Sequence, residues 1–135
     1  MPELPDITVY VEALERRIVG QRLEGVSITS PFLLRTYDIP PDDLAKKQVT
    51  GISRLGKRIG IHLEDDLFLV LHLMIAGRLR WYPREKPAAK VSYKTQLARF
   101  GFSTGELLLV ESASKKRASL HIVRGKDEFQ SHRPE

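Results

Sequence analysis

The chain has no cysteine among its 135 residues, and this absence excludes several classes of site. Without a thiol, these residues form no disulfide framework, no cysteine-based zinc site and no thiol redox motif. Long apolar runs are missing too, because the longest, Leu67 to Leu71, is far too short to cross a bilayer. The first six residues, Met-Pro-Glu-Leu-Pro-Asp, are acidic where a secretory signal is basic. We therefore expect a cytoplasmic protein without membrane contact, and no metal or cofactor in this chain.

Basic residues outnumber acidic ones, 22 to 17, and the excess lies in the middle of the chain. Residues 51–124 carry 14 basic and six acidic side chains, whereas residues 1–50 carry six and eight. Such a basic stretch suggests a polyanionic partner such as nucleic acid, since lysine and arginine displace counterions from phosphates. A solvated basic face without a partner has the same composition and stays open as an alternative.

Apolar spacing predicts one helix followed by a series of strands. Ile7, Tyr10, Leu14 and Ile18 recur at three- and four-residue steps, so a helix is expected from Asp6 to Val19. Further on, apolar and polar residues alternate, as in half-buried antiparallel strands. Strands are expected around residues 26–28, 59–63, 67–73, 79–81, 97–102, 106–111 and 118–124, with a short helix near 44–47. This series indicates a single, mainly β domain, a sandwich or barrel flanked by a helix.

The first three residues, Met-Pro-Glu, contain a candidate nucleophile. Removal of Met1 would leave Pro2 with a free secondary amine, which is less basic than a lysine side chain and therefore more often neutral near pH 7. Attack of this amine on a sugar carbon gives an iminium, and Glu3 beside it could move protons at the same centre. The alternative is that a proline and an acid simply open a helix.

Lys57 lies at the opening of a predicted strand, within Arg54-Leu55-Gly56-Lys57-Arg58. A lysine after a glycine at this place is able to reach over a cleft to a phosphate or a sugar oxygen. An exposed basic turn would have the same composition.

His72 and the residues after it form a second candidate segment. Met74 and Ile75 precede Ala76-Gly77, which indicates a loop between two strands that projects one of the two large apolar side chains. Such a side chain could fill a hole in a stacked duplex, or it could pack into the core. His72 alone, without partners, makes no metal site.

Three adjacent cations, Lys115, Lys116 and Arg117, lie in a loop of small residues between two predicted strands. Adjacent cations repel one another unless an anion is near, which favours contact with phosphates over a bare solvated loop. Arg78 could extend the same basic surface.

In this order, the motifs resemble the N-terminal domain of the formamidopyrimidine-DNA glycosylase and endonuclease VIII family. They are Met-Pro-Glu-Leu-Pro-Asp before a helix, Lys57 at a strand start, and His72 to Leu79. The resemblance implies base-excision DNA repair by a bifunctional glycosylase and AP lyase, which removes oxidised bases through a Schiff base and cuts the strand by β- and δ-elimination. Pro2 would then be the nucleophile, Glu3 the proton donor, and Lys57 the lysine that assists at the sugar and phosphate.

The resemblance also implies an architecture and partners. The expected fold is mainly β, a two-sheet antiparallel β-sandwich with an N-terminal α-helix and a short second helix. The expected partner is damaged double-stranded DNA, bound by a monomer in the bacterial cytosol. The implied DNA contacts are His72, Met74, Ile75, Arg78, Lys115, Lys116 and Arg117.

Residues 1–124 would form the catalytic N-terminal domain, and 125–135 a linker or truncated end. In the family, a helix-two-turn-helix domain and usually a zinc finger follow, so zinc is expected there and not within these 135 residues. The isolated domain is expected to be inactive.

The sequence also departs from the family pattern. The family has Gly-Met where this chain has Met74-Ile75, and an Arg-Arg-Phe-Gly loop where it has Lys115 to Ala118, without an aromatic residue. A retained Met1 would make the Pro2 nitrogen an unreactive amide. A non-catalytic DNA-binding module is therefore the alternative hypothesis, and a basic β-sandwich that binds no DNA is a third.

Overall fold

The computed structural model describes residues 4–85, 94–112 and 115–133. Helix α1 (Leu4–Arg17) is followed by strands in two four-stranded antiparallel sheets. The elements after α1 are β1 (Gly25–Ile28), the 3-10 helix η1 (Pro41–Leu44), β2 (Val49–Leu55), β3 (Arg58–Leu63), β4 (Leu67–His72), β5 (Gly77–Pro83), β6 (Gln96–Phe102), β7 (Gly105–Glu111), β8 (Ser119–Arg124) and α2 (Lys126–Gln130). The predicted two-sheet sandwich with an N-terminal helix and a short second helix is confirmed, but the second α-helix is α2 and does not lie where the sequence predicted it.

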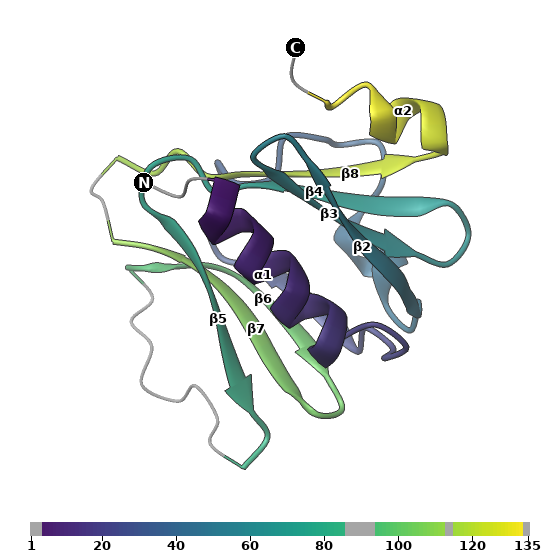
Figure 1. Cartoon of the computed structure of the whole chain (residues 1–135), viewed down its shortest axis with the longest axis horizontal. Coiled ribbons are helices and arrows are strands. Elements are labelled where there is room, and N and C mark those ends of the chain that lie inside the picture. The colour runs from purple at the N-terminus through teal and green to yellow at the C-terminus, as the bar shows by residue number, and fades with distance from the viewer. Residues whose placement is uncertain (1–3, 86–93, 113–114, 134–135) are drawn as a thin grey trace.

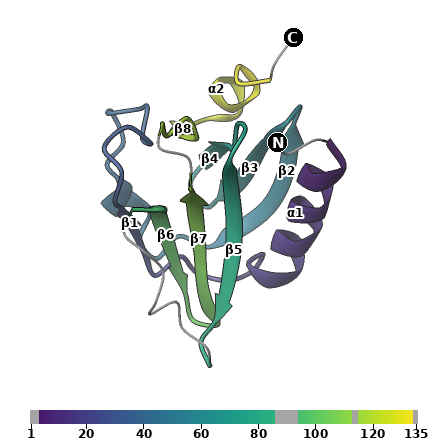
Figure 2. The same cartoon turned by 90° about the vertical axis from the view of Figure 1, so that its left-hand side faces the viewer.

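The two sheets face each other across one main core. Their strand orders are β1-β6-β7-β5 and β2-β3-β4-β8, so β5 and β2 are edge strands. Helix α1 lies across the opening between these two edges, as both views show (Figures 1 and 2). Its apolar stripe explains this position, because Ile7 and Leu14, and Ile18 directly after the helix, are all buried in the core between the sheets.

Strand β4 is apolar along its whole length because both of its faces are buried. One face points into the core between the sheets with Leu69 and Leu71. The other face carries Phe68 and Val70, which pack under Phe129 of helix α2. A strand covered on both sides has no need for polar residues in alternate positions.

Three local expectations need correction or extension. The short helix expected near 44–47 is a 3-10 turn at Pro41–Leu44, after which Lys46 takes a φ of 69° and turns the chain back to pair with Leu23. Strand β2 was not expected, because this half-exposed edge strand carries a register shift between Val49 and Gly51 that breaks the apolar alternation. The stretch 125–135, expected as a linker or truncated end, includes α2, whose docking depends on Phe129.

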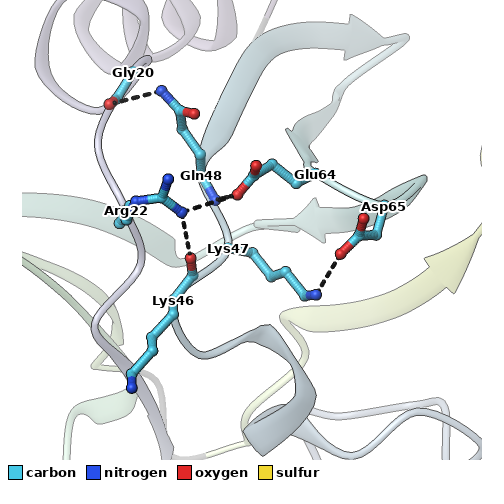
Figure 3. A network of polar contacts seen from close by, with 7 residues as sticks. All are labelled: Gly20, Arg22, Lys46, Lys47, Gln48, Glu64 and Asp65. Carbon is cyan, nitrogen blue, oxygen red and sulfur yellow. Dashed lines mark hydrogen bonds and ion pairs between the residues drawn. The ribbon is translucent and has the colours of Figure 1, made fainter.

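A polar network holds the segment after α1 to the start of β2 and to the β3–β4 turn (Figure 3). One oxygen of Glu64 accepts from the backbone N–H of Gln48 at 2.6 Å and from the guanidinium of Arg22 at 3.2 Å. Lys47 forms an ion pair with Asp65, and this contact lowers the pKa of the Asp65 carboxyl. Such exposed pairs add little stability, so their main effect is to fix how these segments meet.

Candidate nucleic-acid interface

Strand register brings five strand ends to one end of the sandwich. Arg58 at the start of β3 pairs with His72 at the end of β4, which pairs in turn with Ser119 at the start of β8. In the other sheet, Gly77 at the start of β5 pairs with Glu111 at the end of β7. The short loop from His72 to Gly77 joins the two sheets, so all five strand ends lie together. The first turn of α1 lies at the same end (Figures 1 and 2).

All five of the predicted cationic site residues lie at or beside these strand ends, together with Arg58. We call this region the cationic end, and define it by Lys57, Arg58, Arg78, Lys115, Lys116 and Arg117. Residues more than 50 positions apart in the sequence contribute to it. Positive charge concentrated in this way favours a polyanionic partner.

The two residues predicted to do the chemistry, Pro2 and Glu3, lie outside the described residues. Helix α1 begins at Leu4, directly after them in sequence. Their roles stay a prediction.

Lys57 and His72 are brought together across the β3–β4 pairing. The β2–β3 turn contains Gly56, which has a φ of 61°, a backbone conformation that glycine adopts more easily than other residues. Lys57 follows directly and is half-buried. Burial lowers the pKa of His72, and the charges of Arg58 and Lys57 lower it further. His72 is therefore a neutral imidazole near pH 7, which is able both to donate and to accept a hydrogen bond.

The β4–β5 loop exposes Ile75 and keeps Met74 half-buried. Met74 has a φ of 60°, and the following Ile75 is 55% exposed. The loop is tight, because the N–H of Gly77 donates to the carbonyl of Leu73 and a Cβ on Gly77 would lie 2.4 Å from that oxygen. Of the two apolar residues predicted to project, Ile75 is thus the one that faces solvent.

Arg78 has a structural role that the sequence did not indicate. Its guanidinium donates to the carbonyl of Ile75 at 3.2 Å and to that of Gly77 at 2.8 Å. The side chain therefore braces the β4–β5 loop.

Glu111 is a buried acid at the end of β7 that the sequence reasoning missed. It is only 1% exposed, and its carboxylate accepts hydrogen bonds from the backbone N–H groups of Arg117, at 2.8 and 3.0 Å, and Ala118, at 3.2 Å. The ammonium of Lys116 donates to the Glu111 carbonyl at 2.6 Å. The carboxylate therefore fixes the backbone at the end of the loop that carries Lys115, Lys116 and Arg117, which we call the cationic loop. An acid placed directly after the apolar run Leu107–Val110 was the available signal.

A group of histidines lies on the outer face of the sheet that carries α2. The rings of His121 and His132 are 4.6 Å apart, and Arg58 donates to the His132 carbonyl at 2.7 Å. Burial lowers the pKa of His121 to about 4, with further lowering by the charges of His132, Arg58, Arg35 and His72. His121 is therefore neutral near pH 7. The hydrogen bond from Arg58 to His132 and the contact between the two histidine rings hold the residues after α2 against the sheet.

Other kinds of site are not found in the described ranges. Within residues 4–85, 94–112 and 115–133, no three side chains of His, Cys, Asp or Glu gather where they could hold a metal ion. Of the helices in this part of the chain, none has the length and apolar character that crossing a membrane requires. An open hollow of about 380 Å³ lies at the opposite end, lined by Tyr82, Arg84 and Glu106 among others, and contains none of the predicted site residues.

Comparison with known proteins identifies the family. Residues 1–118 match the family model described as the formamidopyrimidine-DNA glycosylase N-terminal domain. The chain is 32% identical over 112 residues to the formamidopyrimidine-DNA glycosylase of Lactococcus lactis subsp. cremoris, an alignment that covers 82% of this chain and 40% of that protein. It is 33% identical over 127 residues to the enzyme of the same name from Streptomyces coelicolor, covering 90% of this chain and 44% of that protein.

Solved structures give the same result. The complex between the Lactococcus lactis enzyme and DNA that contains an abasic site is similar, with a TM-score of 0.83 and 26% identity, covering 97% of this chain and 47% of that one. MutM in complex with DNA that contains carbocyclic 8-oxo-G has a TM-score of 0.82 and 26% identity. The chain thus spans less than half the length of these relatives. By the match of 118 of its residues to the family model and by its fold, the chain belongs to the formamidopyrimidine-DNA glycosylase family, whose N-terminal domain it matches.

Proposed function

We propose that this chain is the DNA-binding and catalytic N-terminal part of a base-excision repair enzyme. The observation that carries the proposal is the cationic end, where five strand ends and the first turn of α1 meet. Membership of the family supports DNA with a damaged or missing base as the substrate class, since relatives are solved with such DNA. The protein would act as a monomer in the bacterial cytosol.

The proposed reaction uses the amine of Pro2, once Met1 is removed, as the nucleophile. The nitrogen forms a bond to C1′ of the damaged nucleotide while the bond from C1′ to the base breaks, and the base leaves with a proton. Loss of the amine proton gives a neutral aminal. The sugar ring then opens: the C1′–O4′ bond breaks, O4′ takes up a proton, and the nitrogen lone pair forms the iminium, which acidifies the proton on C2′. Removal of that proton expels the 3′ phosphate, and a second elimination releases the 5′ phosphate.

The other site residues support this reaction through charge and proton transfer. Glu3 would supply and remove protons beside the amine. Lys57 would hold a phosphate or the sugar oxygen, and the cations Lys115 and Arg117 would bind further phosphates. Neutral His72 beside Lys57 would add a hydrogen bond without adding charge.

Borohydride trapping on DNA with an abasic site tests the proposal directly, because reduction turns a Schiff base into a stable covalent adduct. The Met-free full protein should form the adduct, and the Pro2→Gly and Glu3→Gln variants should form little or none. Lys126→Ala, an exposed lysine on α2 outside the cationic end, is the matched control and should be trapped like the parent.

Two other outcomes would lead to different conclusions. Salt-dependent DNA binding without any trapping would favour the non-catalytic DNA-binding module. The absence of DNA binding, with Lys57→Ala and Lys116→Ala no different from the parent, would favour an interaction domain unrelated to DNA. If the proposal is right, each phosphate contact removed should reduce the salt slope of binding by about 0.9.

A further inference from the structure

A loop before η1 runs along the free edge of β8 and extends that sheet. Leu34 forms a parallel bridge with Leu120. The N–H of Leu120 donates to the carbonyl of Leu33, and the N–H of Arg35 donates to the carbonyl of Leu120, both at 2.9 Å. The N–H of Ile122 donates to the hydroxyl of Thr36 at 3.0 Å. The loop therefore runs in the same direction as β8, which it covers.

This direction places Phe32 at the cationic end. Strand β8 begins there with Ser119, and the pairing of Leu33 and Leu34 with Leu120 lies close to that beginning. Phe32 lies in the turn directly before this paired segment, on the side where β8 begins. Strand β4, whose following loop carries Ile75, pairs with one edge of β8, and the segment after Phe32 pairs with the other edge.

The ring of Phe32 is held out in solvent by a fixed backbone. It is 73% exposed, while the adjacent Leu33 is buried at 1%. The N–H of Leu33 donates to the carbonyl of Ser30 at 3.3 Å, and the side chain of Arg35 donates to the carbonyl of Phe32 at 2.7 Å. A single exposed apolar residue is ordinary on a protein surface. An aromatic ring on a braced turn, at the end of the sheet where three cations precede β8, is a different arrangement, because it suits a partner with both phosphates and flat rings.

We propose that Phe32 stacks on a base of the damaged DNA that has lost its partner or its stacking neighbour. This inference rests on the proposed function, which makes DNA the partner. Cations of the loop bind phosphates, but they do not contact the faces of bases. An aromatic side chain does, because every base offers a flat face to stack on. Such a face is available where a nucleotide is missing or flipped out of the duplex.

The spacing of the two exposed apolar residues fits one short stretch of DNA. The Leu33–Thr36 edge and β4 flank β8, so they are separated by two strand spacings, or about 10 Å. That distance corresponds to about three base steps along a duplex strand, at roughly 3.4 Å each. Phe32 and Ile75 would therefore contact DNA on the two sides of the phosphates held by Lys115 and Arg117.

Binding to two matched duplexes tests the inference. One duplex carries a tetrahydrofuran abasic-site analogue opposite 2-aminopurine, and the other has an intact base pair in its place. In the full protein, Phe32→Ala should weaken binding to the gapped duplex about five- to hundredfold, the range for loss of one stacked base. Binding to the intact duplex and the salt slope should not change, and Phe32→Trp should restore binding to the gapped duplex and the quenching of 2-aminopurine.

Tyr37→Ala is the control, because Tyr37 is 86% exposed on the same loop but lies further along β8, away from the cationic end. It should bind both duplexes like the parent. The thermal unfolding of both variants should match that of the parent, since both rings are mostly exposed.

The outcomes separate this inference from the proposed function. A parent protein that binds neither duplex would contradict the proposed function itself. If the parent prefers the gapped duplex and Phe32→Ala keeps that preference, the proposed function stands and the stacking role is wrong. An equal loss on both duplexes with a smaller salt slope would also overturn the inference, because it would show an effect on the phosphate contacts.

Discussion

The docking of α2 onto the sheet depends on Gly60, because the absence of a side chain there leaves room for the ring of Phe129. A Cβ on Gly60 would lie 2.5 and 2.6 Å from two ring carbons of Phe129. The ring cannot move aside easily, because it stacks on Phe68 at 4.5 Å and lies against the edge of His62 at 5.0 Å. Gly60→Ala should therefore expel Phe129 and release α2 from the sheet.

The size of the effect follows from what α2 contributes. Removing a buried phenylalanine ring costs about 3–5 kcal/mol, and overpacking a core costs about 1–3 kcal/mol. Release of this short helix returns some chain entropy, so it limits the loss. We expect Gly60→Ala to lower the free energy of unfolding by about 2–4 kcal/mol. Phe129→Ala should lower it by about 3 kcal/mol.

A double-mutant cycle separates this clash from any other effect of the substitution. Urea unfolding followed by circular dichroism gives the free energy for the parent, both single variants and the double variant. Once Phe129 is alanine, the added methyl group has no ring to meet, so Gly60→Ala should cost almost nothing more. The two substitutions should thus show an interaction energy of about 2 kcal/mol or more.

Gly51→Ala is the matched control for this cycle. Gly51 lies on the neighbouring strand of the same sheet, and the nearest atom to its Cβ would be a ring carbon of His62 at 3.9 Å, an ordinary contact. Its cost should stay within about 0.5 kcal/mol. The reasoning fails if Gly60→Ala costs the same with and without the Phe129 ring, or if Gly51→Ala costs as much.

Three other predictions concern the cationic end and the sheet behind it. Glu111→Gln removes the carboxylate that holds the cationic loop, so it should lower the free energy of unfolding by about 2–4 kcal/mol and weaken DNA binding. In the control Glu106→Gln, the replaced acid is partly exposed and the loss should be less than about 1 kcal/mol. Equal urea midpoints for the two variants would refute this prediction. The pKa of His121 is about 4 in the folded protein, so between pH 6.5 and 4 this side chain takes up a proton only in the unfolded chain, and stability should fall as the pH drops through that range. Above pH 6.5 this group should not change the stability. His121→Gln should reduce the difference between the urea midpoints at pH 7.5 and pH 5, and an unchanged difference would contradict this prediction. Gly77→Ala should displace the β4–β5 loop and lower both the melting temperature and DNA affinity, and an unchanged melting temperature would count against the close contact with the Leu73 carbonyl.

Where the sequence predicted structure well, the signal was local and repeated. The helix expected at Asp6–Val19 is α1 at Leu4–Arg17, because one apolar stripe faces the core for four turns. The strands followed from the alternation of apolar and polar residues in the same way. Motif residues such as Lys57 and His72 could be placed at strand ends for the same reason.

The missed elements lacked such a signal. Strand β2 carries a bulge that breaks its alternation, and α2 has only Phe129 as a large apolar residue. The evidence for α2 lies elsewhere in the chain, in Gly60 and in the outward-facing Phe68 and Val70, which need a cover. A five-residue segment with one buried apolar residue has no periodic pattern that would predict a helix.

The amino-acid sequence alone determined the mainly β fold, the N-terminal helix and the motifs that lie beside strand ends. Only the tertiary structure decided which of those ends meet. It set Ile75 in solvent instead of Met74, tied the cationic loop to Glu111 and brought Phe32 beside that loop. The reason is physical: periodicity is a property of consecutive residues, whereas the pairing of Thr36 with Ile122, 86 positions away, depends on how the whole core packs.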